Sequence, residues 1–369
     1  MKFVDRIEEQ RRLHKAIHSE NPSALVVVYG RRRLGKSTLI KKVLEQDDIY
    51  FMADNADAGQ QRRLLAKALS FHFDGFDKVE YPDFESLFLQ LNYRTQKHFC
   101  LCIDEFPFIV KEDNTLPSIL QKLIDTKSLK YTILLCGSSQ QMMQGLVLDA
   151  AEPLYGRADT IIHLMPINIK FLQEVLQTDA VSTIEEYAVW GGVPRYWELR
   201  EKEDSLTDTI KYHILDVNGT LYEEPNRLFM DDLTQTTLSS TLLSLVGNGV
   251  NRLSEIAGRM AKPSTELSRP LAKLITLGFL DREIPFAESV RSTKRSIYRV
   301  ADPFMSFFYH YVERIIAGIF SDIACAVFRP WKIVGFIYCI AERPDMNIDR
   351  IDAKRKTVII ILAYTVSEL

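Results

Sequence analysis

The sequence lacks the features that mark several classes of protein. Its five cysteines in 369 residues include no C-x-x-C pair and no metal-ligand spacing, which argues against a cysteine zinc site and a disulfide framework. No apolar run reaches the length that spans a bilayer, and the first residues contain no apolar segment of the kind that directs secretion. Short-period repeats and low-complexity tracts are also missing. Together these absences predict a reduced, cytoplasmic protein with no membrane association.

The chain also has no large excess of charge of either sign. It contains 46 Lys and Arg against 49 Asp and Glu, so its formal net charge of −3 neither favours nor excludes a nucleic-acid partner. Hydrophobic residues make up 46% of the chain and charged residues 26%, as is usual for a globular protein. A chain of 369 residues is long enough for two or three domains.

The stretch VVVYGRRRLGKSTLIKKV, at residues 26–43, carries the strongest functional signal. The apolar run at 25–29 is typical of a buried strand, and the spacing over 37–44 is typical of a helix. Between them lies a G-x-x-x-x-G-K-[ST] motif, whose backbone N–H groups surround a phosphate. Lys36 is expected to reach the β- and γ-phosphates, and the Ser37 hydroxyl to bind Mg²⁺. The expected nucleotide-binding residues of this loop are Gly30, Arg31, Arg32, Arg33, Leu34, Gly35, Lys36, Ser37 and Thr38.

Strand-like and helical patterns alternate through the first half of the chain. Apolar runs at 25–29, 49–53, 98–106, 131–139 and 160–164 are separated by segments with helical spacing. Such alternation is typical of an α/β fold, in which helices cover both faces of a parallel sheet. From about 168 to 221 the pattern becomes helical, and residues 230–300 have the pattern of a separate helical module that ends in a short hairpin.

The strand-like run FCLCIDEF, at 99–106, contains two adjacent carboxylates, Asp104 and Glu105, where the apolar stretch stops. Ligands of parallel sheets bind beyond the carboxyl ends of the strands, so we expect both side chains to emerge near the phosphates. Asp104 is suited to Mg²⁺ coordination together with Ser37. Glu105 is suited to act as the base that polarises the attacking water.

Two further residues are candidates for contact with the transferring phosphoryl group. The run YTILLCGSS, at 131–139, places Ser138 at a strand end, where its hydroxyl can contact the γ-phosphate or the water, or instead cap the next helix. Arg157, in PLYGRADTI at 153–161, can stabilise charge on that group within the chain or across an oligomer interface. A structural ion pair explains Arg157 equally well.

Residues 251–300 have the pattern of a helix-turn-helix followed by a hairpin. Helical segments at 251–260 and 264–277 precede the strand-like runs FLDREI and SIYRV. This region has ten Lys and Arg against five Asp and Glu, a local excess that phosphate contacts would require. The basic residues concentrated at the hairpin are Arg291, Lys294, Arg295 and Arg299. The second helix has few base-reading side chains beyond Arg269 and Lys273, so either DNA or a protein fits as partner.

Six stretches follow one another in an informative order. They are FVDRIEEQRRL, YGRRRLGKSTLI, CLCIDEF, LLCGSS, PLYGRA and YAVWGGVPRYWEL. Their order resembles that of the prokaryotic AAA+-related ATPases of the STAND group, which are common in archaea and anaerobic bacteria, and the match extends to about residue 310. The resemblance implies that the nucleotide is ATP, that Val4 and Arg6 flank the adenine, and that Pro194 closes over the base. It also implies a helical lid and a winged helix after the ATPase core.

The patterns and the resemblance together predict four domains. These are a P-loop ATPase core at 1–165, a helical lid at 166–229, a winged helix at 230–310 and a short α/β tail at 311–369. The tail resembles a degenerate restriction-endonuclease-like core, with Asp349 in the place of the first metal-binding carboxylate. Leu362, Ala363 and Tyr364 replace the second carboxylate and the lysine. Because phosphodiester hydrolysis needs a second anionic ligand, we expect no nuclease activity.

Three functions fit these features. The first is a Mg²⁺-dependent ATP-hydrolysing switch whose nucleotide state controls a protein or DNA partner through the winged helix. The second is a DNA-associated regulator that holds ATP with negligible turnover, and the third is a small-molecule kinase. Glu105 beside Asp104 favours hydrolysis over kinase chemistry, so the ATPase switch is the preferred hypothesis. A homo-oligomer is compatible with a role for Arg157 in a neighbouring copy.

Overall fold

The computed structural model describes residues 6–19, 21–230, 232–233, 236–285 and 295–316. Within these residues the chain divides after Met165 into two compact units, which are considered separately below. In the described ranges, no helix combines the length and the apolar character needed to cross a membrane. The predicted nuclease-like tail, with Asp349 and the segment from Leu362 to Tyr364, lies outside the described residues.

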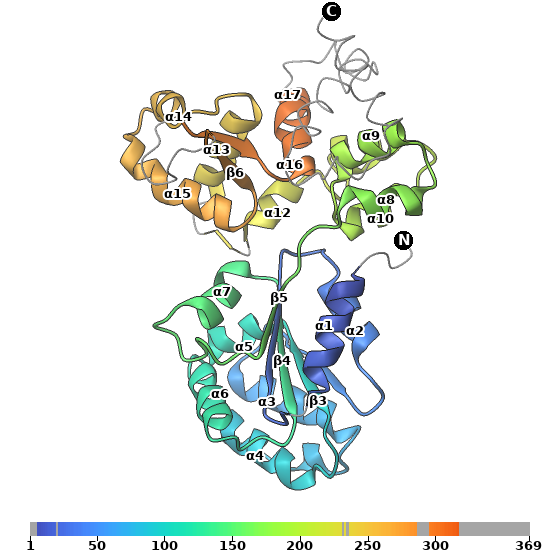
Figure 1. Cartoon of the computed structure of the whole chain (residues 1–369), viewed down its shortest axis with the longest axis vertical. Coiled ribbons are helices and arrows are strands. Elements are labelled where there is room, and N and C mark those ends of the chain that lie inside the picture. Colours follow the sequence, from blue (N-terminus) through green and yellow to red (C-terminus); the bar gives the residue numbers. More distant parts are fainter. Residues whose placement is uncertain (1–5, 20, 231, 234–235, 286–294, 317–369) are drawn as a thin grey trace, which may run out of the picture. The chain divides into compact units, whose positions relative to one another are not determined.

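The first unit is built on a five-stranded parallel sheet with the strand order β2-β3-β4-β1-β5 (Figure 1). Its strands are β1 (Leu25–Tyr29), β2 (Ile49–Met52), β3 (Cys100–Asp104), β4 (Thr132–Gly137) and β5 (Thr160–His163). Every residue of β1, β3 and β4 is buried, because these inner strands have a neighbour on each side and helices on both faces. The predicted α/β fold with a parallel sheet is confirmed. The strand order places the end of β4 between the ends of β1 and β3.

Helices cover both faces of this sheet (Figure 1). Leu25 and Val27 of β1 share one hydrophobic cluster with residues of α3 to α7, whereas α1 and α2 lie on the opposite face, toward which Val26 and Val28 point. Alternate residues of each inner strand are therefore buried under different helices. The helices are α1 (Ile7–Ile17), α2 (Lys36–Val43), α3 (Ala58–Ser70), α4 (Phe84–Arg94), α5 (Phe106–Glu112), α6 (Leu116–Asp125) and α7 (Gln140–Leu148).

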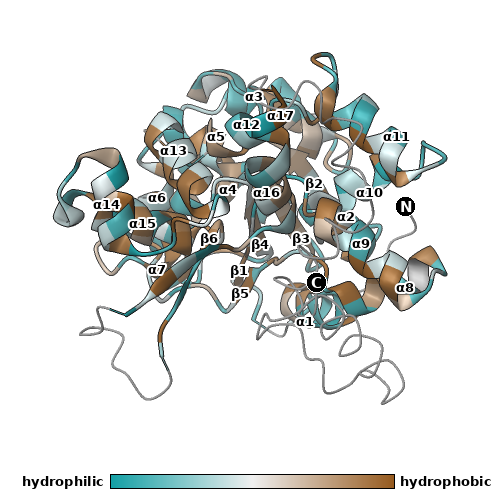
Figure 2. Ribbon diagram, turned by 90° about the horizontal axis from the view of Figure 1, so that it is seen from above, coloured by the Kyte–Doolittle hydropathy of each residue, from teal (hydrophilic) through white to brown (hydrophobic). Residues whose placement is uncertain are grey.

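The second unit begins with a group of short helices. They are α8 (Ile169–Leu176), α9 (Ala180–Trp190), α10 (Pro194–Arg200), α11 (Leu206–Ile210) and α12 (Glu224–Met230). Asn168 and Asp179 cap α8 and α9 by accepting hydrogen bonds from backbone N–H groups of the first turn. Figure 2 shows hydrophobic and hydrophilic residues on the same helix in α8, which is the pattern of a helix with one buried side.

A second part of this unit combines three helices with a two-stranded antiparallel sheet. Its elements are α13 (Thr236–Gly247), α14 (Leu253–Met260), α15 (Ser264–Thr276), β6 (Leu280–Glu283) and β7 (Ile297–Val300). Leu280 pairs with Val300 at one end of the hairpin and Glu283 with Ile297 at the other. The chain then continues through α16 (Pro303–Phe307) and α17 (Glu313–Ile316), with a π-helical segment between them. The domain boundary predicted at residue 311 therefore falls within a helical segment.

Aromatic side chains join the two parts of the second unit. The ring of Tyr196, in α10, lies 4.8 Å from that of Phe304 in α16, measured between centroids. The Tyr196 hydroxyl donates a hydrogen bond of 2.8 Å to Glu224, whose side chain is fully buried. Trp197 donates from its indole nitrogen to the backbone carbonyl of Gly191. These contacts make the short helices and the segment after the hairpin one packed body.

Replacing Gly192 by alanine tests the close approach of two backbone segments of the second unit, at Gly192 and Ile167. An added Cβ would overlap the backbone carbonyl of Ile167, whose N–H also donates a 2.8 Å hydrogen bond to the Gly192 carbonyl. We expect the substitution to cost about 1–3 kcal/mol in the free energy of unfolding, the range found for overpacked interiors. Circular dichroism during heating should show a lower unfolding midpoint.

Gly258→Ala is the matched control, because nothing lies within 4 Å of a Cβ at that position of α14. Alanine is a better helix former than glycine, so this variant should unfold at or above the wild-type midpoint. A Gly192→Ala midpoint at or above that of the wild type would contradict the close approach of Gly192 and Ile167.

Candidate functional site

The glycine-rich loop connects β1 to α2, as predicted. Gly35 has a positive φ of 84° and directly precedes α2, which has no side-chain cap at its N-terminus. The first N–H groups of α2 are thus oriented toward whatever binds in the loop. A Cβ at Gly30 would lie 2.5 Å from the backbone carbonyl oxygen of Leu164, which follows β5. Glycine at position 30 is therefore required by a neighbouring strand end as well as by the loop.

The Lys36 side chain folds back over the loop. Its Nζ donates hydrogen bonds to the carbonyl oxygens of Gly30 at 2.8 Å and Arg31 at 3.0 Å, and the residue is 5% exposed. Burial lowers the pKa of Lys36, since the charged form is partly removed from water. The ammonium group is thus held at the mouth of the loop by weak neutral acceptors, which anionic phosphate oxygens would outcompete.

The other side chains of the loop differ in exposure. Arg31 and Leu34 are buried, Arg33 is half-buried, and Arg32 and Thr38 are exposed. Arg33 adopts a left-handed backbone conformation, with φ of 71°. Only part of the triple arginine thus faces solvent.

Ser37 and Asp104 meet as the predicted metal-binding pair. The Ser37 hydroxyl donates to Oδ2 of Asp104 at 2.6 Å, and Asp104 is 1% exposed at the end of β3. Octahedral Mg²⁺ binds oxygen atoms at 2.0–2.1 Å, so adjacent ligand oxygens lie roughly 3 Å apart. These two oxygens therefore fit a Mg²⁺ ion after a small movement. Burial opposes ionisation of Asp104, yet hydrogen bonds from Cys136, Ser37 and Tyr50 leave its pKa below the ordinary value.

Tyr50 is a site residue that the sequence did not reveal. Its hydroxyl donates a short hydrogen bond of 2.5 Å to the same Oδ2 of Asp104. The ring lies under the ammonium group of Lys41, with Nζ 4.4 Å from the ring centroid. Burial, together with the anionic partner, raises the pKa of Tyr50, so the hydroxyl stays protonated and remains a donor. Tyr50 lies in the middle of β2, and no motif surrounds it.

Glu105 and Ser138 form a second pair next to the first. Glu105 adopts a left-handed conformation, with φ of 53°, between the end of β3 and the start of α5. The Ser138 hydroxyl donates to Oε1 of Glu105 at 2.7 Å. Ser139, and not Ser138, caps α7 by accepting from the N–H of Met142. Of the two roles considered for Ser138, the structure thus assigns the helix cap to its neighbour.

Arg157 lies away from these residues in its own unit. Its guanidinium group forms two parallel hydrogen bonds, each of 2.9 Å, with the carboxylate of Asp125 at the end of α6. Arg157 precedes β5, and the adjacent Asp159 bonds the N–H of Leu25 at the start of β1. This is the amino-terminal edge of a parallel sheet, whereas the phosphate loop follows its carboxyl-terminal edge. A role for Arg157 within its own chain's site is therefore wrong, and a role in a neighbouring copy stays a prediction.

The residues expected near adenine fall into three groups. Val4 lies outside the described residues. Arg6 is 4% exposed and donates hydrogen bonds to the Met165 carbonyl and to Glu9, so it ties the start of α1 to the end of the first unit. Pro194 is the first residue of α10, in the second unit. Its predicted contact with the base stays a prediction.

Comparisons with known sequences agree with this geometry. A family model described as an ATPase domain predominantly from Archaea matches residues 3–198. An uncharacterized protein of Methanocaldococcus jannaschii is 30% identical over 329 residues, which are 86% of this chain and 72% of that protein. An uncharacterized ATP-binding protein of the same organism is 49% identical over 47 residues, or 13% of this chain and 78% of that protein.

Two solved structures share the fold. The Walker-type ATPase of Pyrococcus abyssi aligns with a TM-score of 0.63 and 19% identity, over 83% of this chain and 96% of that chain. The ORC2 protein of Aeropyrum pernix, solved as ADPNP and ADP complexes, aligns with a TM-score of 0.54 and 14% identity, over 85% of this chain and 94% of that chain. The sheet, the phosphate loop and the family match lead to one conclusion: the chain belongs to the family of ATPase domains found predominantly in Archaea, and it is an ATPase.

Proposed function

We propose that this ATPase is a Mg²⁺-dependent switch of the AAA+/STAND type, whose nucleotide state controls a partner through the module of α13 to β7. The arrangement of four side chains around the phosphate loop carries this proposal. Ser37 bonds Asp104 at 2.6 Å and Ser138 bonds Glu105 at 2.7 Å. The proposed metal-binding carboxylate, Asp104, and the proposed general base, Glu105, are thus adjacent residues where β3 ends.

Each side chain has a distinct task in hydrolysis. Bound Mg²⁺ would offset the charge of the phosphate oxygens. Ser37 and Asp104 provide hard oxygen ligands of the kind that Mg²⁺ prefers. Lys36 exchanges the carbonyls of its own loop for β- and γ-phosphate oxygens. Glu105 orients the attacking water and accepts its proton, in the position that the end of β3 gives it.

The Ser138–Glu105 hydrogen bond gives the switch a defined resting state. Oε1 of Glu105 accepts the Ser138 hydroxyl in this state, so this carboxylate oxygen is engaged before nucleotide binds. A γ-phosphate oxygen is an anionic acceptor like the carboxylate, so the Ser138 hydroxyl can bond either of them. Transfer of this hydroxyl to the bound triphosphate would leave Oε1 of Glu105 open to the attacking water.

Glu105→Gln tests the hydrolytic part of the proposal. The amide keeps the size of the side chain and cannot accept the proton, so turnover should fall by about 10²–10⁴-fold, as is typical when a general base is lost. Phosphate release should be measured at saturating ATP, and ATP affinity by titration with a fluorescent analogue. The affinity should stay within a few-fold of the wild type.

Glu112→Gln is the matched control, because Glu112 is an exposed carboxylate at the end of α5, the helix that follows Glu105. It should retain the wild-type rate. An unchanged rate in Glu105→Gln would assign the base to another residue and contradict the proposed mechanism.

The module of α13 to β7 supports the second part of the proposal. α14 and α15 are consecutive helices joined by a short turn, and the β6–β7 hairpin follows, which is the layout of a winged helix. Arg269 is exposed on α15. Oε2 of Glu266 forms an ion pair with Nζ of Lys262 at 3.6 Å. On the hairpin, Arg299 pairs with Glu283 at 3.1 Å. Part of the local positive charge is thus neutralised within the module.

DNA binding by this module is tested by replacing Lys294 and Arg295 with alanine. If the hairpin contacts phosphates, the double variant should bind all duplex sequences more weakly, and log K against log[salt] should flatten by about one unit per lost contact. Fluorescence anisotropy with labelled duplexes measures both effects in the presence of ATP and of ADP. Arg63→Ala with Lys67→Ala, two exposed residues of α3, removes the same charge as a control.

Two results would change this assignment. Equal weakening by the two double variants would indicate a general charge effect and contradict a DNA-binding hairpin. Absence of DNA binding by the full chain at low salt would assign the module to a protein partner.

A further inference from the structure

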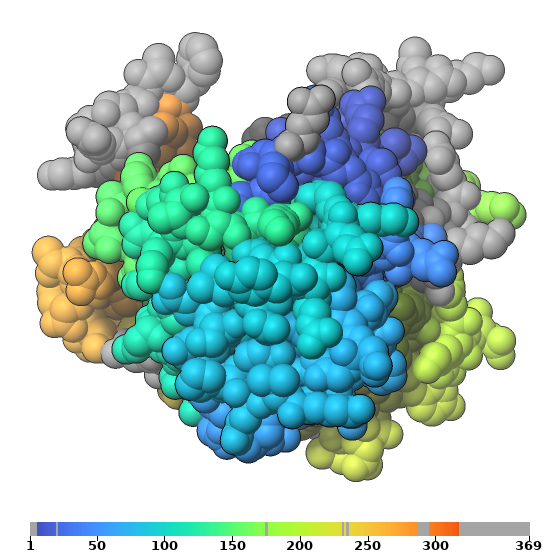
Figure 3. All heavy atoms as spheres, turned by 90° about the horizontal axis from the view of Figure 1, so that it is seen from below, coloured from blue at the N-terminus to red at the C-terminus, as the bar shows by residue number. Residues whose placement is uncertain are grey.

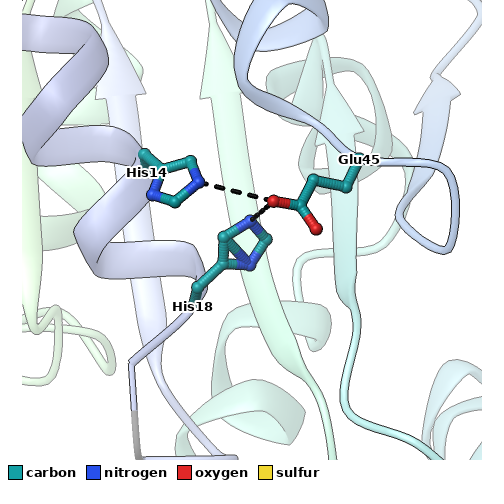
Figure 4. Close-up of side chains that lie close together, drawn as sticks. All are labelled: His14, His18 and Glu45. Carbon is teal, nitrogen blue, oxygen red and sulfur yellow. Dashed lines mark ion pairs between the residues drawn. The ribbon is translucent and has the colours of Figure 1, made fainter.

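Two histidines and a glutamate meet outside the nucleotide site (Figure 4). His14 lies in the last turn of α1 and His18 directly follows that helix, so the two side chains are four residues apart and share one face. Oε1 of Glu45, just after α2, lies 3.4 Å from Nε2 of His14 and 3.3 Å from Nε2 of His18. The three ligand atoms all lie within 4.8 Å of one another. We call these residues the His-His-Glu cluster.

The distances match the size of a small coordination sphere. Zinc binds imidazole nitrogen and carboxylate oxygen at 2.0–2.2 Å in a tetrahedron, so neighbouring ligand atoms lie roughly 3.4 Å apart. Both contacts to Glu45 are close to that separation. Nε2 of His18 is buried, and within the described ranges it has no partner in hydrogen-bond geometry. In the neutral tautomer that carries its proton on Nδ1, this nitrogen offers its lone pair to a metal ion.

The loop that carries Glu45 is held in place by the side chain of Asp48. Asp48 uses both carboxylate oxygens on backbone N–H groups, one from Glu45 at 2.8 Å and the other from Cys100 at 2.7 Å. This brace fixes the turn between α2 and β2 against the start of β3. α1 in turn packs directly on α2. The ligands thus come from two elements whose relative position is already set, which lowers the entropic cost of binding.

We propose that the His-His-Glu cluster binds a divalent cation of the later first-row transition metals, with Zn²⁺ as the representative. Two imidazoles and one carboxylate suit such ions, whereas Mg²⁺ and Ca²⁺ prefer oxygen ligands alone. Three protein ligands leave a fourth position for water. The ion joins the end of α1 to the end of α2, the helix that begins with Lys36 and Ser37.

This metal site is distinct from the nucleotide site. Glu45 precedes β2 by a few residues, and His18 precedes β1, so the cluster lies at the amino-terminal edge of the sheet. The phosphate loop follows the carboxyl-terminal edge. The His14 side chain is 57% exposed, and Figure 3 shows residues of α1, in dark blue, at the molecular surface. A metal ion can therefore reach the cluster from solvent while ATP is bound.

Calorimetric titration of the nucleotide-free full chain with Zn²⁺, after treatment with a chelator, tests the proposal. The wild type should bind one equivalent of Zn²⁺. His14→Ala and His18→Ala should bind Zn²⁺ roughly a hundredfold more weakly or worse, because losing a direct ligand costs at least as much as losing an outer-shell partner. Glu45→Gln should weaken the same site. Co²⁺ in place of Zn²⁺ should give the visible absorption bands of a tetrahedral nitrogen–oxygen site in the wild type but not in His14→Ala or His18→Ala.

His72→Ala is the matched control, because His72 is an exposed histidine just after α3 and outside the cluster. Circular dichroism and ATP binding without Zn²⁺ should be unchanged in all four variants, which shows that they fold. Zn²⁺ should raise the unfolding midpoint of the wild type and of His72→Ala but not of His14→Ala. Equal Zn²⁺ affinity in His14→Ala and wild type, or no binding by the wild type, would overturn the proposal and leave only a histidine–glutamate ion pair.

Discussion

The buried carboxylate of Asp104 is the interaction on which the candidate site depends. It ends β3 and accepts hydrogen bonds from Ser37 of α2, Tyr50 of β2 and the thiol of Cys136 in β4. A carboxylate that is 1% exposed is costly to bury, and these donors offset that cost. One side chain thereby ties three neighbouring strands to the phosphate-loop helix. The predicted metal ligand is held ready before any ion binds.

Glu105 benefits from the same anchor. Its backbone N–H donates to Oδ1 of Asp104, and its side chain accepts from Ser138 at the end of β4. Because β4 lies between β1 and β3, Ser138 follows a strand that neighbours both the strand before the phosphate loop and the strand that ends in Asp104. The left-handed backbone of Glu105 turns its side chain toward Ser138 at the cost of some strain. The strand order thus explains why chain segments far apart in sequence converge on one catalytic constellation.

The parts of this site that sequence could predict are those encoded by neighbouring residues. The phosphate loop and the Asp104–Glu105 pair each lie within one continuous stretch whose flanks indicate a strand or a helix. Tyr50 was missed because its contact with Asp104 spans 54 residues and depends on the register of β2 against β3, which no local pattern encodes. Ser138 and Ser139 are adjacent hydroxyls, and only the observed start of α7 separates the cap from the site residue.

Arg157 and the second unit show the same limit in a different way. The strand predicted at 160–164 already placed Arg157 at the edge opposite the phosphate loop of its own chain. The ion pair with Asp125, which holds Arg157 there, spans 32 residues and has no local signal. In the second unit the helical pattern was predictable from apolar spacing. The tilted ring contact of Tyr196 with Phe304 was not, because it joins residues in α10 and α16 through shape complementarity.

The most direct measurement of the central claim is the effect of Mg²⁺ on nucleotide affinity in Asp104→Asn. A fluorescent ATP analogue should bind the wild type at least roughly tenfold more tightly with Mg²⁺ than with a chelator, a coupling of about 1.4 kcal/mol. Asp77→Asn, at an exposed position, should behave like the wild type. Asp104→Asn should bind with one affinity in both conditions, since the amide cannot replace an anionic ligand. Full retention of the Mg²⁺ effect in Asp104→Asn would contradict the role of this carboxylate.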